Sequence, residues 1–139
     1  PTILKESVPV IEILDSATQV CGQNAAAKRI KIEVECREDL EWLLNPALIE
    51  QAVVNLIDNA IRYGAAAGAI RLGLRRAGDQ VRCTVSSTGP AIPAAERERI
   101  FDRFARGATA AGAGSGLGLN LARSGYSVHF ICSSMPLRP

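Results

Sequence analysis

Apolar residues recur at helical spacing in two long stretches of the chain. Residues 10–28 carry the first series, and residues 46–63 carry the second. Such spacing places the apolar side chains on one face of an α-helix, where they can pack against a sheet. The two stripes consist of Ile11, Leu14, Ala17 and Val20 in the first stretch and Ile49, Val53, Leu56, Ile57 and Ala60 in the second. Both stretches are therefore predicted to be helices.

The second predicted helix also has marked ends. Asn45 precedes it as a capping residue, and Pro46 stands at its first turn, where a missing N–H is tolerated. Gly64 follows the helix, and we expect it to close the last turn in a left-handed conformation. This helix is the best-defined element of the sequence.

Period-two alternation predicts strands elsewhere. Residues 29–35 alternate clearly, and residues 40–44, 69–75, 80–86 and 126–132 are further candidates. The turn-forming residues 76–79 join two of these strands into a hairpin. Short helices are predicted at 94–104 and 117–123, and the small, glycine-rich segment 105–115 between them is predicted to be a mobile loop. We expect a single domain over residues 1–139, because no repeat or linker divides the chain.

Composition narrows the class of protein without identifying it. The chain has 139 residues, of which 47% are hydrophobic, and a net charge of +2. That hydrophobic share suffices for a core, and so small a charge argues against nucleic acid as the main partner. Apolar runs stay well short of the roughly 20 residues that cross a bilayer, and the first ten residues do not resemble a signal peptide. This fragment is therefore expected not to span a membrane.

The four cysteines are widely spaced along the chain, at Cys21, Cys36, Cys83 and Cys132. They form neither a CxxC pair nor a Cys/His cluster, so the usual metal and redox motifs are excluded. The pattern favours buried, reduced thiols in a cytosolic domain.

Candidate chemistry begins on the second predicted helix. Asn55 and Asn59 are four residues apart, so they share one helix face and lie one turn from each other. Their amide oxygens can converge on one ligand, and oxygen atoms are the ligands that Mg²⁺ prefers. A solvated helix face is the alternative interpretation, and it is the more common one for an isolated asparagine pair.

Two glycine-rich stretches follow, at residues 87–93 and 112–119. In the second stretch Gly114, Gly116 and Gly118 stand at the start of a predicted helix, where backbone amides and the helix N-terminus can approach phosphate oxygens. The stretch matches neither a Walker motif nor a dinucleotide fingerprint. A flexible linker is the alternative explanation.

Three segments together resemble sensor histidine kinases. Residues 55–63, 100–106 and 114–119 are similar to the asparagine box, phenylalanine box and second glycine box of that family, in its order and approximate spacing. The resemblance covers about residues 11–121 and extends to the superfamily that includes DNA gyrase and MutL. It implies the Bergerat fold, a two-layer α/β sandwich in which helices cover one face of a mixed, mostly antiparallel sheet. It also implies an ATP-binding catalytic domain that transfers the γ-phosphoryl group to a histidine.

The resemblance further implies roles for individual residues. Asn59, together with Asn55, would hold the Mg²⁺ that bridges the ATP phosphates. Asn55 stands where gyrase-like ATPases carry a water-activating glutamate, which fits a kinase rather than a hydrolase. Arg106 would stabilise charge at the γ-phosphate, so Asn55 and Arg106 are the candidate catalytic residues. The implied nucleotide contacts are Asn59, Arg62, Tyr63, Ser87, Gly89, Ala91, Gly114, Gly116, Leu117 and Gly118.

The first glycine box departs from the family pattern Asp-x-Gly-x-Gly. Ser87 replaces the aspartate that accepts a hydrogen bond from the adenine amino group, and Ala91 replaces the second glycine. Weakening such a bond corresponds to roughly ten- to hundredfold in affinity. Two interpretations therefore stay open: an active kinase, or a degenerate, non-catalytic interaction module with weak or no ATP binding.

The C-terminal residues 122–139 are also atypical. They leave room for about one strand, so the sheet is expected to be incomplete at one edge, which would offer a contact for a homodimer. The single histidine, His129, lies in a predicted strand and is not expected to be the phosphoacceptor. The resemblance therefore implies a separate histidine-bearing domain and a response regulator as partners. It places the domain in the cytosolic portion of a membrane-anchored sensor.

Overall fold

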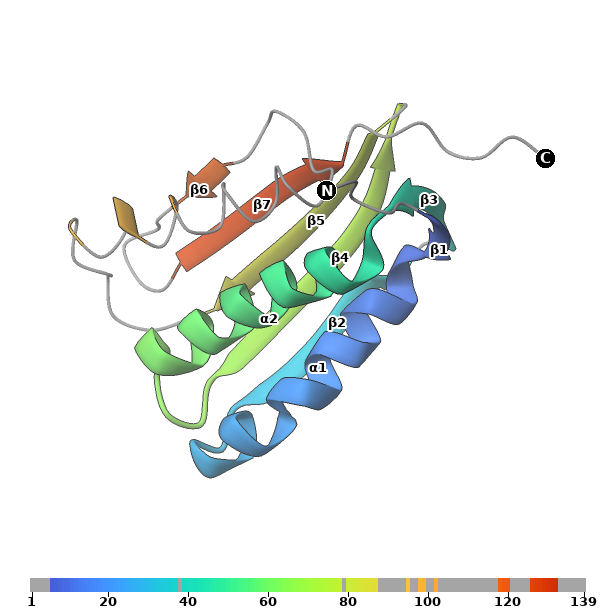
Figure 1. The fold of residues 1–139 in the computed structure, drawn as a ribbon. Coiled ribbons are helices and arrows are strands. Elements are labelled where there is room, and N and C mark those ends of the chain that lie inside the picture. The colour runs from blue at the N-terminus through green and yellow to red at the C-terminus, as the bar shows by residue number, and fades with distance from the viewer. Residues whose placement is uncertain are drawn as a thin grey trace.

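The observed architecture is a layer of helices on a layer of strands. The computed structural model describes residues 6–37, 39–78, 80–87, 95, 98–99, 102, 118–120 and 126–132. Within these residues two long helices lie side by side across one face of a five-stranded sheet (Figure 1). The predicted two-layer α/β sandwich is confirmed.

The elements follow one another as β1 (Glu6–Pro9), α1 (Val10–Ala27), β2 (Lys31–Arg37), β3 (Glu41–Leu44), α2 (Pro46–Tyr63), β4 (Ala69–Ala77), β5 (Gln80–Ser87), β6 (Gly118–Asn120) and β7 (Tyr126–Cys132). The main sheet has the strand order β2-β4-β5-β7-β6. Strands β2 and β4 run parallel, and the other neighbours are antiparallel, so the sheet is mixed and mostly antiparallel. Strands β1 and β3 form a separate antiparallel pair, and β1 has no counterpart among the predicted elements.

The core lies between the helices and the sheet. Alternate residues of β4 and β5 are buried, as expected for strands with one covered face. Helix α2 contributes a continuous apolar stripe that includes every residue predicted for it. The buried residues of these three elements are Ile70, Leu72, Leu74, Val81, Cys83 and Val85 in the strands and Ile49, Ala52, Val53, Leu56, Ile57, Ala60 and Ile61 in α2.

The N-terminal end of α2 forms as the sequence predicts. The side-chain oxygen of Asn45 accepts a hydrogen bond from the Leu48 N–H at 3.0 Å, and Pro46 occupies the first turn. This bond satisfies one of the N–H groups that a helix start leaves without an intrahelical partner. The cap therefore fixes the residue at which the helix begins.

The C-terminal end of α2 differs from the prediction. Gly64 is extended, with φ −75° and ψ 161°, rather than left-handed. The ammonium group of Lys28, just after α1, donates instead to the carbonyl oxygens of Ile61 at 2.6 Å, Arg62 at 3.3 Å and Gly64 at 3.2 Å. A side-chain cation thus satisfies carbonyl groups that a left-handed cap would satisfy with backbone N–H groups. The expected conformation of Gly64 is therefore wrong, because the cap comes from another helix.

Within the helix predicted at 117–123, the described residues Gly118–Asn120 form the strand β6, so the helix prediction is wrong there. In β6, Gly118 lies opposite His129, and Asn120 lies opposite Ser127 of β7. Before Ser124 the segment offers only about two helical turns, which is too short for a helix to be stable by itself, whereas pairing with β7 satisfies backbone groups. Among the described residues, the three of β6 pair with part of the seven-residue strand β7.

Two further predictions concern residues that the structure describes only in part. Of the helix predicted at 94–104, the described residues Ala95, Glu98, Arg99 and Asp102 are helical. The loop predicted at 105–115 lies outside the described residues. Among the described helices, none combines the length and apolar character needed to cross a membrane.

A thiol lies in the contact between the two helices. Cys21 of α1 and Cys83 of β5 are both buried thiols, which confirms the prediction for these two cysteines. The Cys21 thiol donates to the Val54 carbonyl oxygen of α2 at 3.8 Å. Burial, followed by the charge and hydrogen bond of the Asp58 carboxylate, raises the pKa of Cys21 to about 12. The thiol is therefore neutral in the folded protein at physiological pH.

Replacing Lys28 by methionine should lower the free energy of unfolding by about 1–2 kcal/mol, because the hydrogen bonds of a partly exposed cation to the end of α2 are lost. Urea denaturation measures this loss. The matched control is Lys31→Met, which removes an exposed lysine at the start of β2. Equal stability losses in the two variants would contradict the capping role of Lys28.

Stability should also depend on pH through Cys21. The thiol pKa is about 12 in the folded state against an ordinary value of 9.0, so its contribution is complete below pH 9 and is lost as pH rises toward 12. The stability difference between the wild type and Cys21→Ser should therefore change by about 1 kcal/mol between pH 7 and pH 10, to the disadvantage of the wild type. Urea titrations at both pH values measure the difference. A difference that is constant with pH would contradict the raised pKa.

Candidate functional site

One edge of the buried stripe on α2 carries the polar residues singled out in the sequence. Asn55 is exposed and Asn59 is half-buried, and they lie one turn apart. Arg62 lies seven residues after Asn55, and Tyr63 lies four residues after Asn59, so at about 100° per residue each falls within about 40° of the corresponding asparagine. The opposite edge of the stripe, at Val54 and Ile61, is the one that faces α1. These four residues therefore lie along one polar flank of α2, beside its buried stripe.

Arg62 and Tyr63 interact at the last turn of this flank. The Arg62 guanidinium carbon lies 5.4 Å from the centroid of the Tyr63 ring, within the range of a cation–π contact. Tyr63 is half-buried and packs against the core, whereas Arg62 is exposed. The Tyr63 ring therefore limits the movement of the Arg62 guanidinium group, whose positive charge stays accessible to a ligand.

Ser87 lies at the same end of the sandwich. It is the last residue of β5 and pairs with Ile70 near the start of β4, and β4 begins six residues after α2 ends. Figure 1 shows the C-terminal end of β5 beside the C-terminal half of α2. Because Val81, Cys83 and Val85 point into the core, the alternation of the strand places Ser87 on the helix-covered side.

The Ser87 hydroxyl lies in surroundings that bury it without offering a hydrogen-bond partner. Its Oγ is buried and has no hydrogen-bond partner among the described residues. A buried hydroxyl left in this state costs about 1–3 kcal/mol. Ser87 lies on the helix-covered side of the sheet, at the end of β5 that Figure 1 shows beside the C-terminal half of α2.

Of the remaining candidates from the sequence, Gly118 is the one that the structure describes. Gly118 lies in the edge strand β6, which is separated from β5 by β7. The arrangement therefore does not place it at the start of a helix, as its expected phosphate-binding role required. The other predicted residues lie outside the described part of the chain: Gly89, Ala91, Arg106, Gly114, Gly116 and Leu117.

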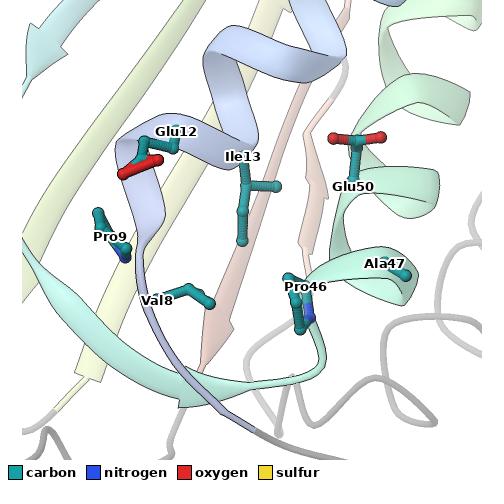
Figure 2. A pocket seen from close by; sticks show the side chains of 7 residues that line it. All are labelled: Val8, Pro9, Glu12, Ile13, Pro46, Ala47 and Glu50. Atoms are coloured by element: carbon teal, nitrogen blue, oxygen red, sulfur yellow. The ribbon is translucent and has the colours of Figure 1, made fainter.

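Two cavities lie elsewhere in the described part of the chain. One, of about 250 Å³, lies at the N-terminal ends of α1 and α2 and is lined by Val8, Pro9, Glu12, Ile13, Pro46, Ala47 and Glu50. Figure 2 shows Glu12 and Glu50 on the two helices that flank it, and their negative charges oppose the binding of phosphates. The other, of about 320 Å³, lies on the outer face of the sheet and is lined by Glu35, Gly73, Arg75, Arg82 and Thr84. Neither includes the polar flank of α2.

Comparison with known proteins places the chain in a family. The model of the family described as "Histidine kinase-, DNA gyrase B-, and HSP90-like ATPase" matches residues 44–130. The matched span includes α2 and β5, and thus both the polar flank and Ser87.

Curated relatives are sensor proteins. The chain is 39% identical over 125 residues to the adaptive-response sensory kinase SasA of Synechococcus sp. (strain JA-3-3Ab), a match over 88% of this chain and 31% of SasA. It is 33% identical over 124 residues to the alginate biosynthesis sensor protein KinB of Pseudomonas aeruginosa, over 88% of this chain and 21% of KinB. The chain thus spans less than a third of the length of either relative.

Solved structures share the fold. The catalytic domain of histidine kinase ThkA superposes with a TM-score of 0.82 at 20% identity, over 96% of this chain and 99% of that chain. Full-length ShkA in complex with AMPPNP gives 0.82 at 21% identity, over 100% of this chain and 33% of that chain. ThkA in complex with the response regulator protein TrrA gives 0.75 at 21% identity, over 97% of this chain and 42% of that chain. At these identities the likeness establishes the architecture.

Proposed function

The chain belongs to the family of histidine kinase-, DNA gyrase B- and HSP90-like ATPases, and we propose that it is the ATP-binding catalytic domain of a two-component sensor histidine kinase. The proposed reaction transfers the γ-phosphoryl group of ATP to a histidine on a separate helical domain. The observation that carries the proposal is the polar flank of α2, which combines Asn55, Asn59, Arg62 and Tyr63 inside the span that the family model matches. The identity to the sensory kinase SasA supports the same assignment.

The proposal assigns Mg²⁺ to the asparagine pair. Asn55 and Asn59 carry neutral amide oxygens on adjacent turns, and Asn59 is partly shielded from solvent. Such ligands suit a metal that keeps several waters and shares its coordination with nucleotide phosphates. When bound, the ion neutralises charge on the phosphates during transfer.

Asn55 also bears on the choice between transfer and hydrolysis. An amide has no basic group that could take a proton from water, whereas a carboxylate does. A site with Asn55 in this position therefore lacks a general base where the gyrase-like ATPases carry one. This favours phosphoryl transfer to a protein over hydrolysis of ATP.

The positive charges of the site act on the phosphates. Arg62, restricted by Tyr63, lies on the same flank as the asparagine pair and is assigned to phosphate and ribose contacts. Arg106 lies outside the described residues and is assigned to the γ-phosphate from its place after the phenylalanine box. Each would stabilise negative charge that develops during transfer.

The proposed partners follow from the reaction. A histidine-bearing helical domain receives the phosphoryl group, and a response regulator takes it over, as the complex of ThkA with TrrA suggests. The buried thiols of Cys21 and Cys83 fit the reducing cytosol. A non-catalytic interaction module is the second candidate, and the observation that favours it is Ser87 in place of the adenine-binding aspartate.

Asn59→Ala should abolish Mg²⁺-dependent binding of ATP while leaving the stability of the domain nearly unchanged, since the apolar stripe of α2 is intact. Calorimetric titration with ATP, in the presence and absence of Mg²⁺, measures the effect. The control is Asn24→Ala, which removes an exposed asparagine from α1. Unchanged Mg²⁺-dependent affinity in Asn59→Ala would contradict the metal assignment.

Arg106→Ala should slow phosphoryl transfer by about 100-fold or more while changing ATP affinity much less, because the charge it stabilises develops mainly in the transition state. Radiolabelled ATP and a purified histidine-bearing acceptor domain provide the measurement. The control is Arg82→Ala, on the outer face of β5. Equal transfer rates in the two variants would contradict the catalytic role of Arg106. ATP binding by the wild type without any transfer would favour the non-catalytic module.

A further inference from the structure

The Ser87 hydroxyl is a buried polar group whose hydrogen-bonding capacity is unused by the described residues. Its Oγ is buried and has no partner among the described residues, and buried polar groups are nearly always paired in folded proteins. Two other buried atoms share this state, Ser7 Oγ and Trp42 Nε1. They belong to the β1–β3 pair, which is separate from the sheet that carries Ser87. Ser87 is therefore the one of these three that adjoins the polar flank of α2.

A hydroxyl and a carboxylate offer a base different hydrogen-bonding groups. An ionised carboxylate only accepts, whereas a hydroxyl donates one hydrogen bond and also accepts. Adenine presents an amino group at its six-position, which donates, and guanine presents a carbonyl oxygen there, which accepts. A carboxylate facing that position therefore selects adenine, and a hydroxyl fits both bases.

We propose that the nucleotide site of this chain accepts guanine as well as adenine nucleotides, with Ser87 as the residue that sets this relaxed specificity. The inference rests on the proposed function, because it requires the base to lie at the end of β5. The Ser87 hydroxyl accepts a hydrogen bond from the adenine amino group or donates one to the guanine carbonyl oxygen. The site thereby recognises a purine nucleoside triphosphate rather than ATP alone.

Strand geometry supports Ser87 rather than its neighbour for this role. Ser86 precedes it and lies on the opposite face of the sheet, because side chains alternate along a strand. Its partner in β4 is Arg71, which is exposed and forms an ion pair with Glu35 at 3.0 Å. Ser86 is thus directed away from the helices, and it provides a matched control position.

The test compares four proteins: the wild type, Ser87→Asp, Ser87→Ala and Ser86→Asp. Each is titrated calorimetrically with ATP and with GTP in the presence of Mg²⁺, after thermal unfolding has confirmed that it is folded. The wild type should bind the two nucleotides with dissociation constants within about threefold of each other. Ser87→Asp should bind ATP about tenfold more tightly while GTP binding does not improve, because at the six-position of the base the new carboxylate accepts from the adenine amino group and repels the guanine carbonyl oxygen. Ser87→Ala should weaken both nucleotides, and Ser86→Asp should match the wild type.

The ratio of the two affinities in the wild type decides the inference even if Ser87→Asp fails to fold. Binding of ATP at least tenfold tighter than GTP by the wild type would overturn the relaxed specificity and leave the proposed function standing. Binding of neither nucleotide by the wild type would overturn both. Equal affinity of the wild type and Ser87→Ala for both nucleotides would remove Ser87 as the determinant.

Discussion

The packing of α2 against the sheet is the constraint on which both the fold and the candidate site depend. Seven buried residues form its apolar stripe, and one edge of that stripe contacts α1. Helix geometry then leaves Asn55, Asn59, Arg62 and Tyr63 on the other edge, so the same rotation of α2 that fills the core also orients the site. Asn45 and Lys28 bind the two ends of the helix and so oppose fraying at the turns that carry these residues. A site built in this way is held by the core rather than by loops.

Local signals explain why so much of the fold was predictable. The bounds of α2 follow from Asn45, Pro46 and a regular apolar stripe, and the β4–β5 hairpin follows from alternation around a short turn. The wrong predictions, for the Gly64 cap and for β6, concern local structures that depend on contacts with distant parts of the sequence. Lys28 lies 33 residues or more before the carbonyl groups that it binds at the end of α2. The sequence around Gly64 therefore does not indicate that a lysine side chain, rather than a left-handed glycine, caps this helix. β6 likewise depends on pairing with β7, which an apolar run of a few residues does not reveal.

The candidate site was predictable from the order of motifs along the chain rather than from local spacing. The spacing of Asn55 and Asn59 is equally compatible with a solvated helix face, and only the order of three motifs, now supported by the family match over residues 44–130, separates the two interpretations. The sequence shows that a serine stands at position 87. That its hydroxyl is buried and unpaired among the described residues follows from the register of β5 with β4 and from the cover of the helices. The sequence alone therefore identifies the serine as a departure from the family motif, and the position of β5 is needed to show which hydrogen bonds its hydroxyl can form.

The proposed nucleotide site runs along the polar flank of α2 and the end of β5. It is tested most directly by titrating the ¹⁵N-labelled chain with Mg²⁺ and ATP and following its backbone amide resonances. We expect the largest shifts at Asn55, Asn59, Tyr63 and Ser87, while Glu12 and Glu50, at the acidic cavity, are unaffected. Shifts concentrated at Glu12 and Glu50, or the absence of shifts along α2 at saturating nucleotide, would contradict it.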